Sequence, residues 1–321
     1  MITIPDPFTQ ATVAREGAAG AAWLAGLPAV VAALVDRWGC VLDGAATHGG
    51  VGLVVPVRRR DGAAAVLKVS FPHPGNVHEP DAFEAWQGRG AVALYERDDA
   101  RFAMLLERAH ASTLSEVADG DEVATVAGRI SHRLAVPAPA VLPRLRDQAD
   151  SWEAGLRRDA AELAHDLPER TVGAALATVR ELGRAQPDIV VHGDLHPRNV
   201  LRADREPWLA VDPKGCAGDP AYDGGTLLKA RAGALLASDD VDRAARRTLD
   251  VFAEAAELDG ERVRRWAQLH AVLAAFWGRR HGFRVVRGGA SLDPLISCAD
   301  RLAKSLAADP RRRGAVGPRV P

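Results

Sequence analysis

The stretch VVHGDLHPRNVL, residues 190–201, followed by LAVDPK at residues 209–214, decides how this chain is interpreted. Asn199 stands five residues after Asp194, and Asp212 stands eighteen residues after Asp194 at the end of an apolar run. Short apolar runs precede both polar parts and predict two strands, which a polar loop joins into an isolated hairpin. Polar side chains clustered at the ends of strands indicate a site of chemistry.

These three polar residues have the spacing of a phosphoryl-transfer site. Phosphoryl transfer needs a carboxylate that orients the acceptor hydroxyl and takes its proton, and Asp194 is the candidate for this catalytic base. It also needs oxygen ligands for Mg²⁺ on the phosphates, and Asn199 and Asp212 are the candidate metal ligands. The pattern therefore predicts an enzyme that uses magnesium with ATP, or with GTP as the alternative nucleotide.

The rarity of lysine makes one basic residue informative. Only four of the 41 basic residues are lysines, and Lys68 is the only lysine in the first 213 positions. In a chain that otherwise uses arginine, a lysine inside an apolar strand indicates a compact ammonium placed for phosphate. Kinases hold such a lysine with a glutamate from the next helix. Glu79, which Pro80 follows directly, is the candidate partner, and Glu84 is the reserve.

A glycine-rich stretch precedes this lysine by two predicted strands. The sequence THGGVGL, residues 47–53, supplies Gly49, Gly50 and Gly52. Backbone amides at glycine can approach phosphate oxygens closely, because no Cβ intervenes. Alone, such a stretch is typical of a plain turn. With Lys68 after it, we interpret it as a short phosphate-binding loop.

The rest of the sequence predicts two lobes of different texture. Strand-like runs at residues 52–58 and 63–70 flank Asp61-Gly62, which is a hairpin turn signal, and an apolar helix over residues 23–38 should cover a core. A helix over residues 78–86 and short strands near residues 91–95 and 102–106 complete the first lobe. Helical periodicity then predicts helices over residues 115–135, 150–165, 171–186, 224–237, 240–257, 260–280 and 291–307.

We therefore expect an α+β, bilobal fold. Residues 1–107 should form the small β-rich, nucleotide-binding lobe, and residues 108–309 the larger, mainly helical lobe with the catalytic loop and acceptor site. The basic, proline- and glycine-rich tail at residues 310–321 should be disordered.

Composition narrows the classes of partner and compartment. The formal net charge of −1 argues against a generally basic surface, so no nucleic acid is expected as a partner. The apolar stretch at residues 21–35 is shorter than the roughly 20 residues of a membrane span, so no membrane partner is expected. Cys40, Cys216 and Cys298 form no disulfide or zinc pattern and suit a reducing compartment. We expect a cytoplasmic monomer.

Several motifs occur in the order of one known family. They are VLKV at 66–69, LLER at 105–108, HGDLHPRN at 192–199 and VDPKGCAGDPAYD at 211–223. Together they resemble the aminoglycoside phosphotransferases, and most closely the branch of streptomycin 6-kinases and hydroxyurea phosphotransferases, over about residues 15–305.

This resemblance implies a protein-kinase-like fold and a role for each matching residue. Asp194 would be the base, the backbone near Glu107 and Ala109 would meet the adenine, and Asp223 would hold the catalytic loop. The acceptor would be a small molecule, a cationic aminoglycoside and most closely streptomycin at its 6-position, with antibiotic resistance as the biology. Where the branch has a large apolar residue after Asp223, this chain has Gly224-Gly225, which leaves the acceptor open.

Other functions stay open on the sequence alone. A kinase of the same fold could act on hydroxyurea or an endogenous metabolite, and a protein with this loop could bind nucleotide without transferring phosphate. A different class, a metal-dependent hydrolase, would use His192, Asp194 and His196, because alternate residues on a strand point to one face.

Overall fold

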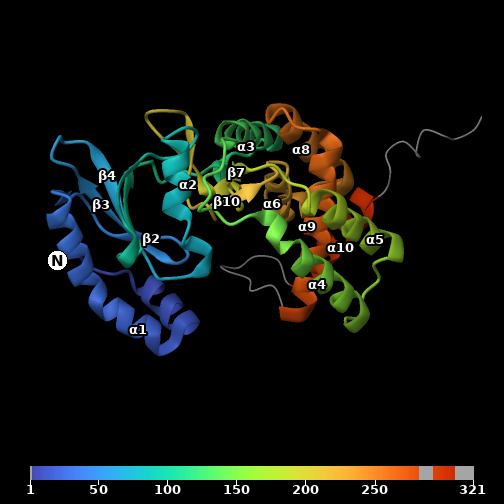
Figure 1. Cartoon of the computed structure of the whole chain (residues 1–321), viewed down its shortest axis with the longest axis horizontal. Coiled ribbons are helices and arrows are strands. Elements are labelled where there is room, and N and C mark those ends of the chain that lie inside the picture. Colours follow the sequence, from blue (N-terminus) through green and yellow to red (C-terminus); the bar gives the residue numbers. More distant parts are fainter. Residues whose placement is uncertain (1, 282–291, 308–321) are drawn as a thin grey trace, which may run out of the picture. The chain divides into compact units, whose positions relative to one another are not determined.

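The computed structural model describes residues 2–281 and 292–307 (Figure 1). The chain divides into two compact units, the first formed by Met1–Ser112 with Leu201–Gly215 and the second by Thr113–Val200 with Cys216–Pro321. The segment after the catalytic loop thus belongs to the first unit. The tail predicted at residues 310–321 lies outside the described residues.

The first unit is built on an antiparallel sheet. Its strands are β1 (Val41–Leu42), β2 (Thr47–His48), β3 (Gly52–Arg58), β4 (Ala64–Ser70), β5 (Leu94–Asp98) and β6 (Ala103–Glu107). They are ordered β1-β3-β4-β6-β5, and β2 pairs with β3. The predicted hairpin of β3 and β4 is confirmed, with Val54 opposite Lys68. Its turn uses Gly62 at φ 83°, a conformation that glycine adopts without a steric cost.

Helix α1 (Asp6–Arg37) packs its apolar face into the core of this sheet (Figure 1). Leu24, Leu27, Val31 and Leu34 recur at helical spacing and are buried with the inward side chains of β3, β4 and β6. The helix covers the core as predicted, but it begins earlier because Gly17, at φ 62°, joins a preceding helical segment across a kink. By length and composition alone, α1 is also apolar enough to cross a membrane, the single such helix within residues 2–281 and 292–307.

The second unit is mainly helical, which confirms the predicted fold class. Its helices are α3 (Gly120–Leu134), α4 (Ala149–Glu162), α5 (Glu169–Thr178), α6 (Tyr222–Ala230), α7 (Ala232–Leu236), α8 (Val241–Ala255), α9 (Gly260–His281) and α10 (Leu292–Ala307). The helix predicted over residues 224–237 is divided into α6 and α7. The division falls at Arg231, whose amide donates to the carbonyls of both Leu227 and Leu228 and so tightens the turn.

The predicted hairpin around the catalytic loop is wrong in its pairing. Two short antiparallel ladders form instead: β7 (Ile189–Val191) with β10 (Cys216–Gly218), and β8 (Val200–Arg202) with β9 (Trp208–Ala210). The chain returns to an extended conformation directly after a turn over Pro197–Asn199, so β8 precedes β9 by a short loop. β8 pairs with β9 because the two strands are neighbours in the sequence, so their pairing closes a shorter loop than the predicted pairing of β7 with β9. A strand of three residues is too short to show a periodic pattern in the sequence.

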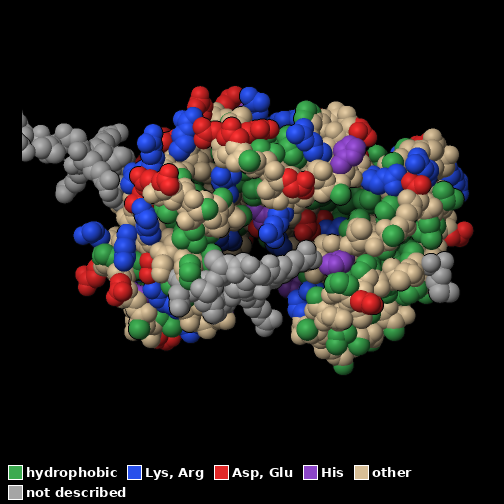
Figure 2. Space-filling model, turned by 180° about the vertical axis from the view of Figure 1, so that it is seen from behind, with side chains coloured by type: hydrophobic (Ala, Val, Ile, Leu, Met, Phe, Trp, Pro, Cys, Tyr) green, Lys and Arg blue, Asp and Glu red, His purple; other side chains and the backbone are tan. Residues whose placement is uncertain are grey.

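Surface charge and cysteines agree with the composition. On the face shown in Figure 2, acidic and basic side chains are interspersed and do not gather by sign. All three cysteines are buried and free of disulfides.

In the first unit, α2 (Glu79–Trp86) adds the helix predicted near residue 78 and carries the glutamate proposed to hold Lys68.

Candidate active site

An ionic cluster inside the first unit joins three residues that are distant in the sequence. The ammonium of Lys68 on β4 donates to Glu79 Oε1 at 2.5 Å and to Asp212 Oδ1 at 2.6 Å. Lys68 and Glu79 are buried, whereas the Asp212 side chain is 43% exposed. Buried charges persist only when they are paired, and this cluster pairs its ammonium with two carboxylates. One buried ammonium is therefore shared by a buried carboxylate and an accessible one.

Local backbone features bring the cluster together. Pro80 falls in the first turn of α2, where its missing N–H leaves no helical hydrogen bond unmade, so it does not disturb Glu79. Gly215, at φ 63°, packs so tightly that a Cβ would lie 2.2 Å from the carbonyl oxygen of His78. Only glycine permits this approach, which presses the segment after Asp212 against the start of α2. Asp212 itself has φ 61°, an uncommon conformation that marks functional turns.

Burial and charge act in opposite directions on this cluster. Burial lowers the pKa of Lys68, but the charges and hydrogen bonds of Glu79 and Asp212 outweigh burial and raise it. Burial raises the pKa of Glu79 to about 7, against the opposing charge of Lys68. Lys68 is consequently a permanent cation, fixed at one position on the sheet.

The three glycines predicted to meet phosphate differ in their surroundings. A Cβ at Gly49 or Gly50 would meet nothing within 4 Å, so these two positions are open. A Cβ at Gly52 would lie 2.8 Å from Ser70 Oγ and 3.2 Å from Lys68 Cε. Glycine at position 52 therefore keeps the space above the lysine stem clear, and this arrangement fits a phosphate group near the ammonium.

A second ammonium lies near the cluster and was assigned no role from the sequence. A Cβ on Gly75 would lie 3.4 Å from Lys214 Nζ, and the charge of Lys214 lowers the pKa of Glu79 against the effect of burial. Lys214 stands two residues after Asp212 and is one of only four lysines. Its rarity was the only signal in the sequence, since Lys214 lies in no strand.

In the predicted adenine-binding segment, residues 107–109, hydrogen bonds hold Glu107 in place. The carboxylate of Glu107 accepts from the amide of Ala93 at 3.0 Å and from two guanidinium nitrogens of Arg205. The amide of Glu107 donates to the carbonyl of Ala93 at 2.8 Å. Glu107 thus anchors the end of β6, and the contact of residues 107–109 with adenine stays a prediction.

The catalytic loop belongs to the second unit and is held by a buried carboxylate. Asp223, in the first turn of α6, accepts from the amides of His192 and Gly193, each at 3.0 Å. Gly193 has φ 77°, which lets consecutive amides converge on one side chain. Burial raises the pKa of Asp223 to about 7, against the amides that favour its charged form. Asp223 therefore fixes the backbone just before Asp194, as the resemblance implies.

Asn199 links the two ends of this loop. Its amide nitrogen donates to the carbonyl of Asp194 at 3.1 Å, which orients the side chain and leaves its oxygen for another ligand. Asn199 is buried, whereas the Asp194 side chain is 31% exposed. An accessible carboxylate on a fixed loop, beside an oriented amide oxygen, has the form required of a base with a neighbouring metal ligand.

The arrangement of the histidines contradicts the hydrolase hypothesis. His192 is fully buried, and its Nδ1 accepts from the amide of Asp194 at 3.3 Å, so it supports the loop. His196 Nε2 lies 3.8 Å from Asp194 Oδ2. Throughout residues 2–281 and 292–307, no three His, Cys, Asp or Glu side chains come together in a group that could hold a metal ion. The strand on which the hypothesis depended ends at Val191.

The motif before α6 has a structural role. The carboxylate of Asp219 accepts from Trp266 Nε1 at 2.6 Å and from Arg262 Nε at 2.5 Å, and its other oxygen accepts from the amide of Ala221. Asp219 thereby fastens the start of α6 to α9. Asp223 and its neighbour Tyr222 are positioned by this attachment.

Comparison with known proteins agrees with the motifs. Residues 37–282 match the family described as aminoglycoside/hydroxyurea antibiotic resistance kinase. The chain is 38% identical to streptomycin 6-kinase of Streptomyces glaucescens over 296 residues, 92% of this chain and 94% of that one. It is 36% identical to hydroxyurea phosphotransferase of Kitasatospora aureofaciens over 281 residues, 86% of this chain and 80% of that one.

A solved structure supports the kinase-like fold. The aminoglycoside phosphotransferase APH(4)-Ia has a TM-score of 0.54 with this chain at 13% sequence identity, and the match covers 91% of this chain and all of that one. Such low identity shows the fold alone. The family and the sequence relatives add the reaction class, a phosphotransferase that acts on a hydroxyl group, and the family implies a nucleoside triphosphate and a divalent metal. The chain belongs to the family of aminoglycoside/hydroxyurea antibiotic resistance kinases.

Proposed function

We propose that this enzyme transfers the γ-phosphoryl group of Mg·ATP to streptomycin, at the 6-hydroxyl, and thereby confers resistance to that antibiotic. The observation that carries the proposal is the pairing of Lys68 with Glu79 and Asp212, which fixes one ammonium beside an accessible carboxylate, as phosphate and metal binding require. The name of the relative from Streptomyces glaucescens supports the acceptor.

Each predicted residue has a proposed part in the reaction. Asp194 accepts the proton of the acceptor hydroxyl, because its carboxylate is accessible on a loop fixed by Asp223. Lys68, held by Glu79, neutralises charge on the phosphates. The metal supplies charge neutralisation at the phosphates when bound, and the oxygens of Asn199 and Asp212 are its proposed ligands.

The nucleotide is proposed to lie against the β-rich unit. The amides of Gly49, Gly50 and Gly52 would meet the phosphates, and the backbone between Glu107 and Ala109 would meet the base. Competition of ATP with GTP in the assay below decides between the two nucleotides. We also propose a cytoplasmic monomer, and its mass in solution by light scattering tests the oligomeric state.

A coupled ADP-release assay tests the function. Wild-type protein is supplied with Mg·ATP and with streptomycin, kanamycin or hydroxyurea in separate reactions, and the Asp194→Ala variant serves as the control. ADP release that depends on streptomycin and is lost in the variant supports the proposal. Release with all acceptors absent, equal in both proteins, would refute it.

A second candidate acceptor is hydroxyurea, which the name of the relative from Kitasatospora aureofaciens supports. Turnover with hydroxyurea and none with streptomycin would select it. Nucleotide binding with no turnover on any of the three compounds would direct the search to endogenous metabolites with hydroxyl groups. Nucleotide binding that also leaves such metabolites unphosphorylated would identify a binding module.

A further inference from the structure

The glycine-rich turn between β2 and β3, residues 49–51, has all three of its carbonyl groups bound. The carbonyl of Gly50 accepts from Arg15 Nη1 at 3.1 Å. The carbonyl of Gly49 accepts from Nδ1 of the His48 ring at 2.9 Å, and the carbonyl of Val51 accepts from a backbone amide, that of residue 71, at 2.9 Å. Three consecutive peptide groups of the turn are therefore held through their oxygens.

Two amides of the same turn are free for a ligand. Within residues 2–281 and 292–307, the amides of Gly50 and Val51 donate no hydrogen bond. A Cβ at Gly50 would meet nothing within 4 Å, so no side chain crowds the turn at this residue. Consecutive unbonded amides in a turn form the concave donor set that binds an anion.

The bond from Arg15 determines where one of these amides points. The carbonyl of Gly50 and the N–H of Val51 belong to one peptide group, and in a trans peptide these two bonds point in opposite directions. A donor fixed on the oxygen therefore holds the N–H on the other side of the turn. A charged donor also polarises the peptide, which makes its N–H a stronger donor.

Arg15 belongs to the N-terminal segment, residues 6–16, which the kink at Gly17 separates from the rest of α1. Phe8 anchors this segment, because its side chain is 1% exposed and its ring packs on that of His48 with the centroids 5.3 Å apart. His48 directly precedes the glycine-rich turn. The segment thus contacts the turn through Arg15 and the strand before it through Phe8.

A second bond orients the Arg15 guanidinium. Its Nε donates to Glu16 Oε1 at 2.5 Å, which leaves Nη1 for the carbonyl of Gly50. The Arg15 side chain is 34% exposed, so a substitution here removes the contact with the turn and opens no cavity in the core. The region that matches the family begins at residue 37, after the N-terminal segment, so the family comparison gives Arg15 no role.

We propose that Arg15 is a positioning residue for the nucleotide. Through the carbonyl of Gly50 it fixes the peptide group that carries the Val51 amide, so that this amide and that of Gly50 face the phosphates. Arg15 acts through the backbone and does not touch the nucleotide, because it lies on the opposite side of the peptide. The inference rests on the proposed function insofar as the glycine-rich turn meets the phosphates.

Two ligands that differ in their phosphates test the inference without any reaction. They are AMP-PNP with Mg²⁺, which is a non-hydrolysable analogue of ATP, and adenosine, which has no phosphate. Calorimetry with the full chain should show that Arg15→Met weakens binding of AMP-PNP by about five- to tenfold, because the turn must then be ordered by the ligand, and leaves binding of adenosine unchanged. An equal loss for both ligands, or no loss for AMP-PNP, would overturn the proposal.

Arg60→Met is the matched control. It makes the same change at an exposed arginine of the same unit, in the turn after β3 and beyond the end of the strand opposite to the glycine-rich turn. A strand of this length spans roughly 20 Å, more than the Debye length at physiological ionic strength. Arg60→Met should leave both affinities unchanged. A loss as large as that in Arg15→Met would show that net charge governs the affinity, and it would refute positioning.

Backbone NMR relaxation measures the positioning itself in the absence of nucleotide. The order parameter of the Val51 amide should lie near 0.85 in the wild type, as in rigid backbone, and fall below about 0.6 in Arg15→Met, as in a flexible loop. An order parameter that does not change would show that the other carbonyl contacts suffice to hold the turn. That result would overturn the role of Arg15 even where binding of AMP-PNP is weakened.

Kinetics separate this inference from the proposed function. If streptomycin is turned over, Arg15→Met should raise the KM for ATP about fivefold and leave the KM for streptomycin unchanged, and an unchanged KM for ATP would refute the inference alone. If streptomycin is not turned over, the proposed acceptor is wrong, and calorimetry with AMP-PNP still decides the inference. Wild-type protein that binds AMP-PNP no more tightly than adenosine would overturn the inference, because the turn would then meet no phosphate.

Discussion

Replacement of Asp223 by asparagine should change how stability depends on pH. Asp223 is 1% exposed, and burial raises its pKa from an ordinary value near 3.8 to about 7 despite the amides of His192 and Gly193. Because the folded-state pKa is the higher one, the folded protein binds the proton more tightly than the unfolded chain. The stabilisation is therefore present in full below about pH 3.8 and is lost as the pH rises toward 7.

The size of the effect follows from the two pKa values. Linkage over these values gives a loss of about 2.5 kcal/mol in the free energy of unfolding between pH 5 and pH 8 from this one group. The carboxamide introduced by Asp223→Asn carries no titrating proton, so the variant should lack this loss. At high pH, where wild-type Asp223 is ionised, the variant should also be less stable by about 1–3 kcal/mol, because an amide oxygen is a weaker acceptor for the two backbone amides than a carboxylate.

Urea unfolding followed by circular dichroism measures both terms at a series of pH values. The difference in unfolding free energy between wild type and variant cancels the titration of other groups. We expect this difference to shrink by about 2.5 kcal/mol from pH 5 to pH 8. A difference that grows with pH would show that the amides outweigh burial, and a constant difference would show an ordinary pKa for Asp223. Either result would refute the reasoning.

The other predictions concern catalysis and packing. Asp194→Asn should lower kcat by about 10²- to 10⁴-fold and leave the affinity for nucleotide unchanged, measured by ADP release and by calorimetry, and full activity would exclude Asp194 as the base. Lys68→Met should weaken nucleotide binding at least tenfold, because the fixed cation is lost, and unchanged binding would remove Lys68 from the phosphate site. Gly224→Ala should lower the free energy of unfolding by about 1–3 kcal/mol, because its Cβ would lie 2.6 Å from Val263 Cγ1, whereas Gly233→Ala, with nothing within 4 Å, should cost nothing. Equal stability of these two variants in urea would contradict the packing argument.

The residues that the sequence identified are those that depend on local order along the chain. Asp194, Asn199 and Asp212 lie on one loop and one short hairpin, so their spacing along the chain can be recognised in the sequence itself. Lys68 was identified through rarity, and Glu79 through the helix that follows the lysine strand. Their contact at 2.5 Å was predictable because a strand and the next helix of one unit pack together.

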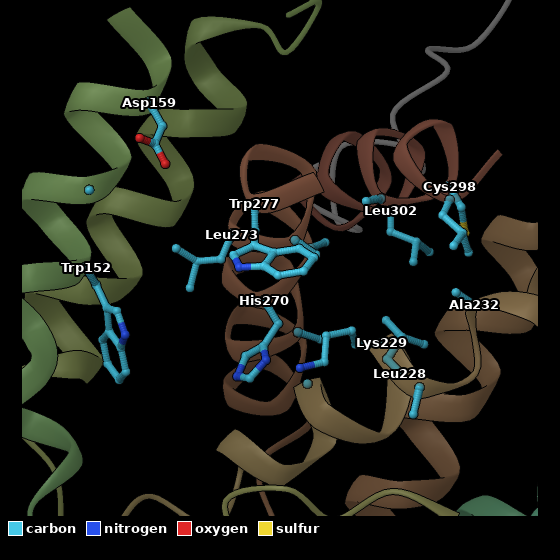
Figure 3. Close-up of a pocket in the computed structure, with 18 of the residues that line it drawn as sticks. Trp152, Asp159, Leu228, Lys229, Ala232, His270, Leu273, Trp277, Cys298 and Leu302 are labelled. Carbon is cyan, nitrogen blue, oxygen red and sulfur yellow. The ribbon is translucent and has the colours of Figure 1, made fainter. Parts of the chain in front are cut away.

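The features that escaped prediction arise from contacts between distant segments. The pairing of β7 with β10 joins residues around 190 and 217, and strands of three residues carry no periodicity to reveal it. Gly225 of α6 also packs directly against the His270 ring of α9 (Figure 3), and this contact depends on how the two helices pack. The sequence shows that Gly224-Gly225 replace the large apolar residue of the branch. It does not show which side chain from elsewhere in the chain fills the space that the glycines leave.

The ionic cluster of the first unit suggests how ligand binding and stability are coupled. Lys68 is shared by Glu79 and Asp212, so two carboxylates face one ammonium, and the charge of Asp212 acts with burial to raise the pKa of Glu79. A divalent cation bound with the nucleotide would offset the negative charge of Asp212, which is the accessible carboxylate of the cluster at 43% exposed.

Mg·ADP at 100 times its Kd should therefore raise the free energy of unfolding by about 2.7 kcal/mol, measured as a shift in Tm, and ADP with a chelator should give a much smaller shift. In Asp212→Asn the chelator should make little difference to the shift, because the metal-dependent part is lost while Lys68 still meets the phosphates. Stabilisation by Mg·ADP that persists unchanged in Asp212→Asn would mean that another group holds the metal. It would leave the bond between Asp212 and Lys68 as a structural ion pair only.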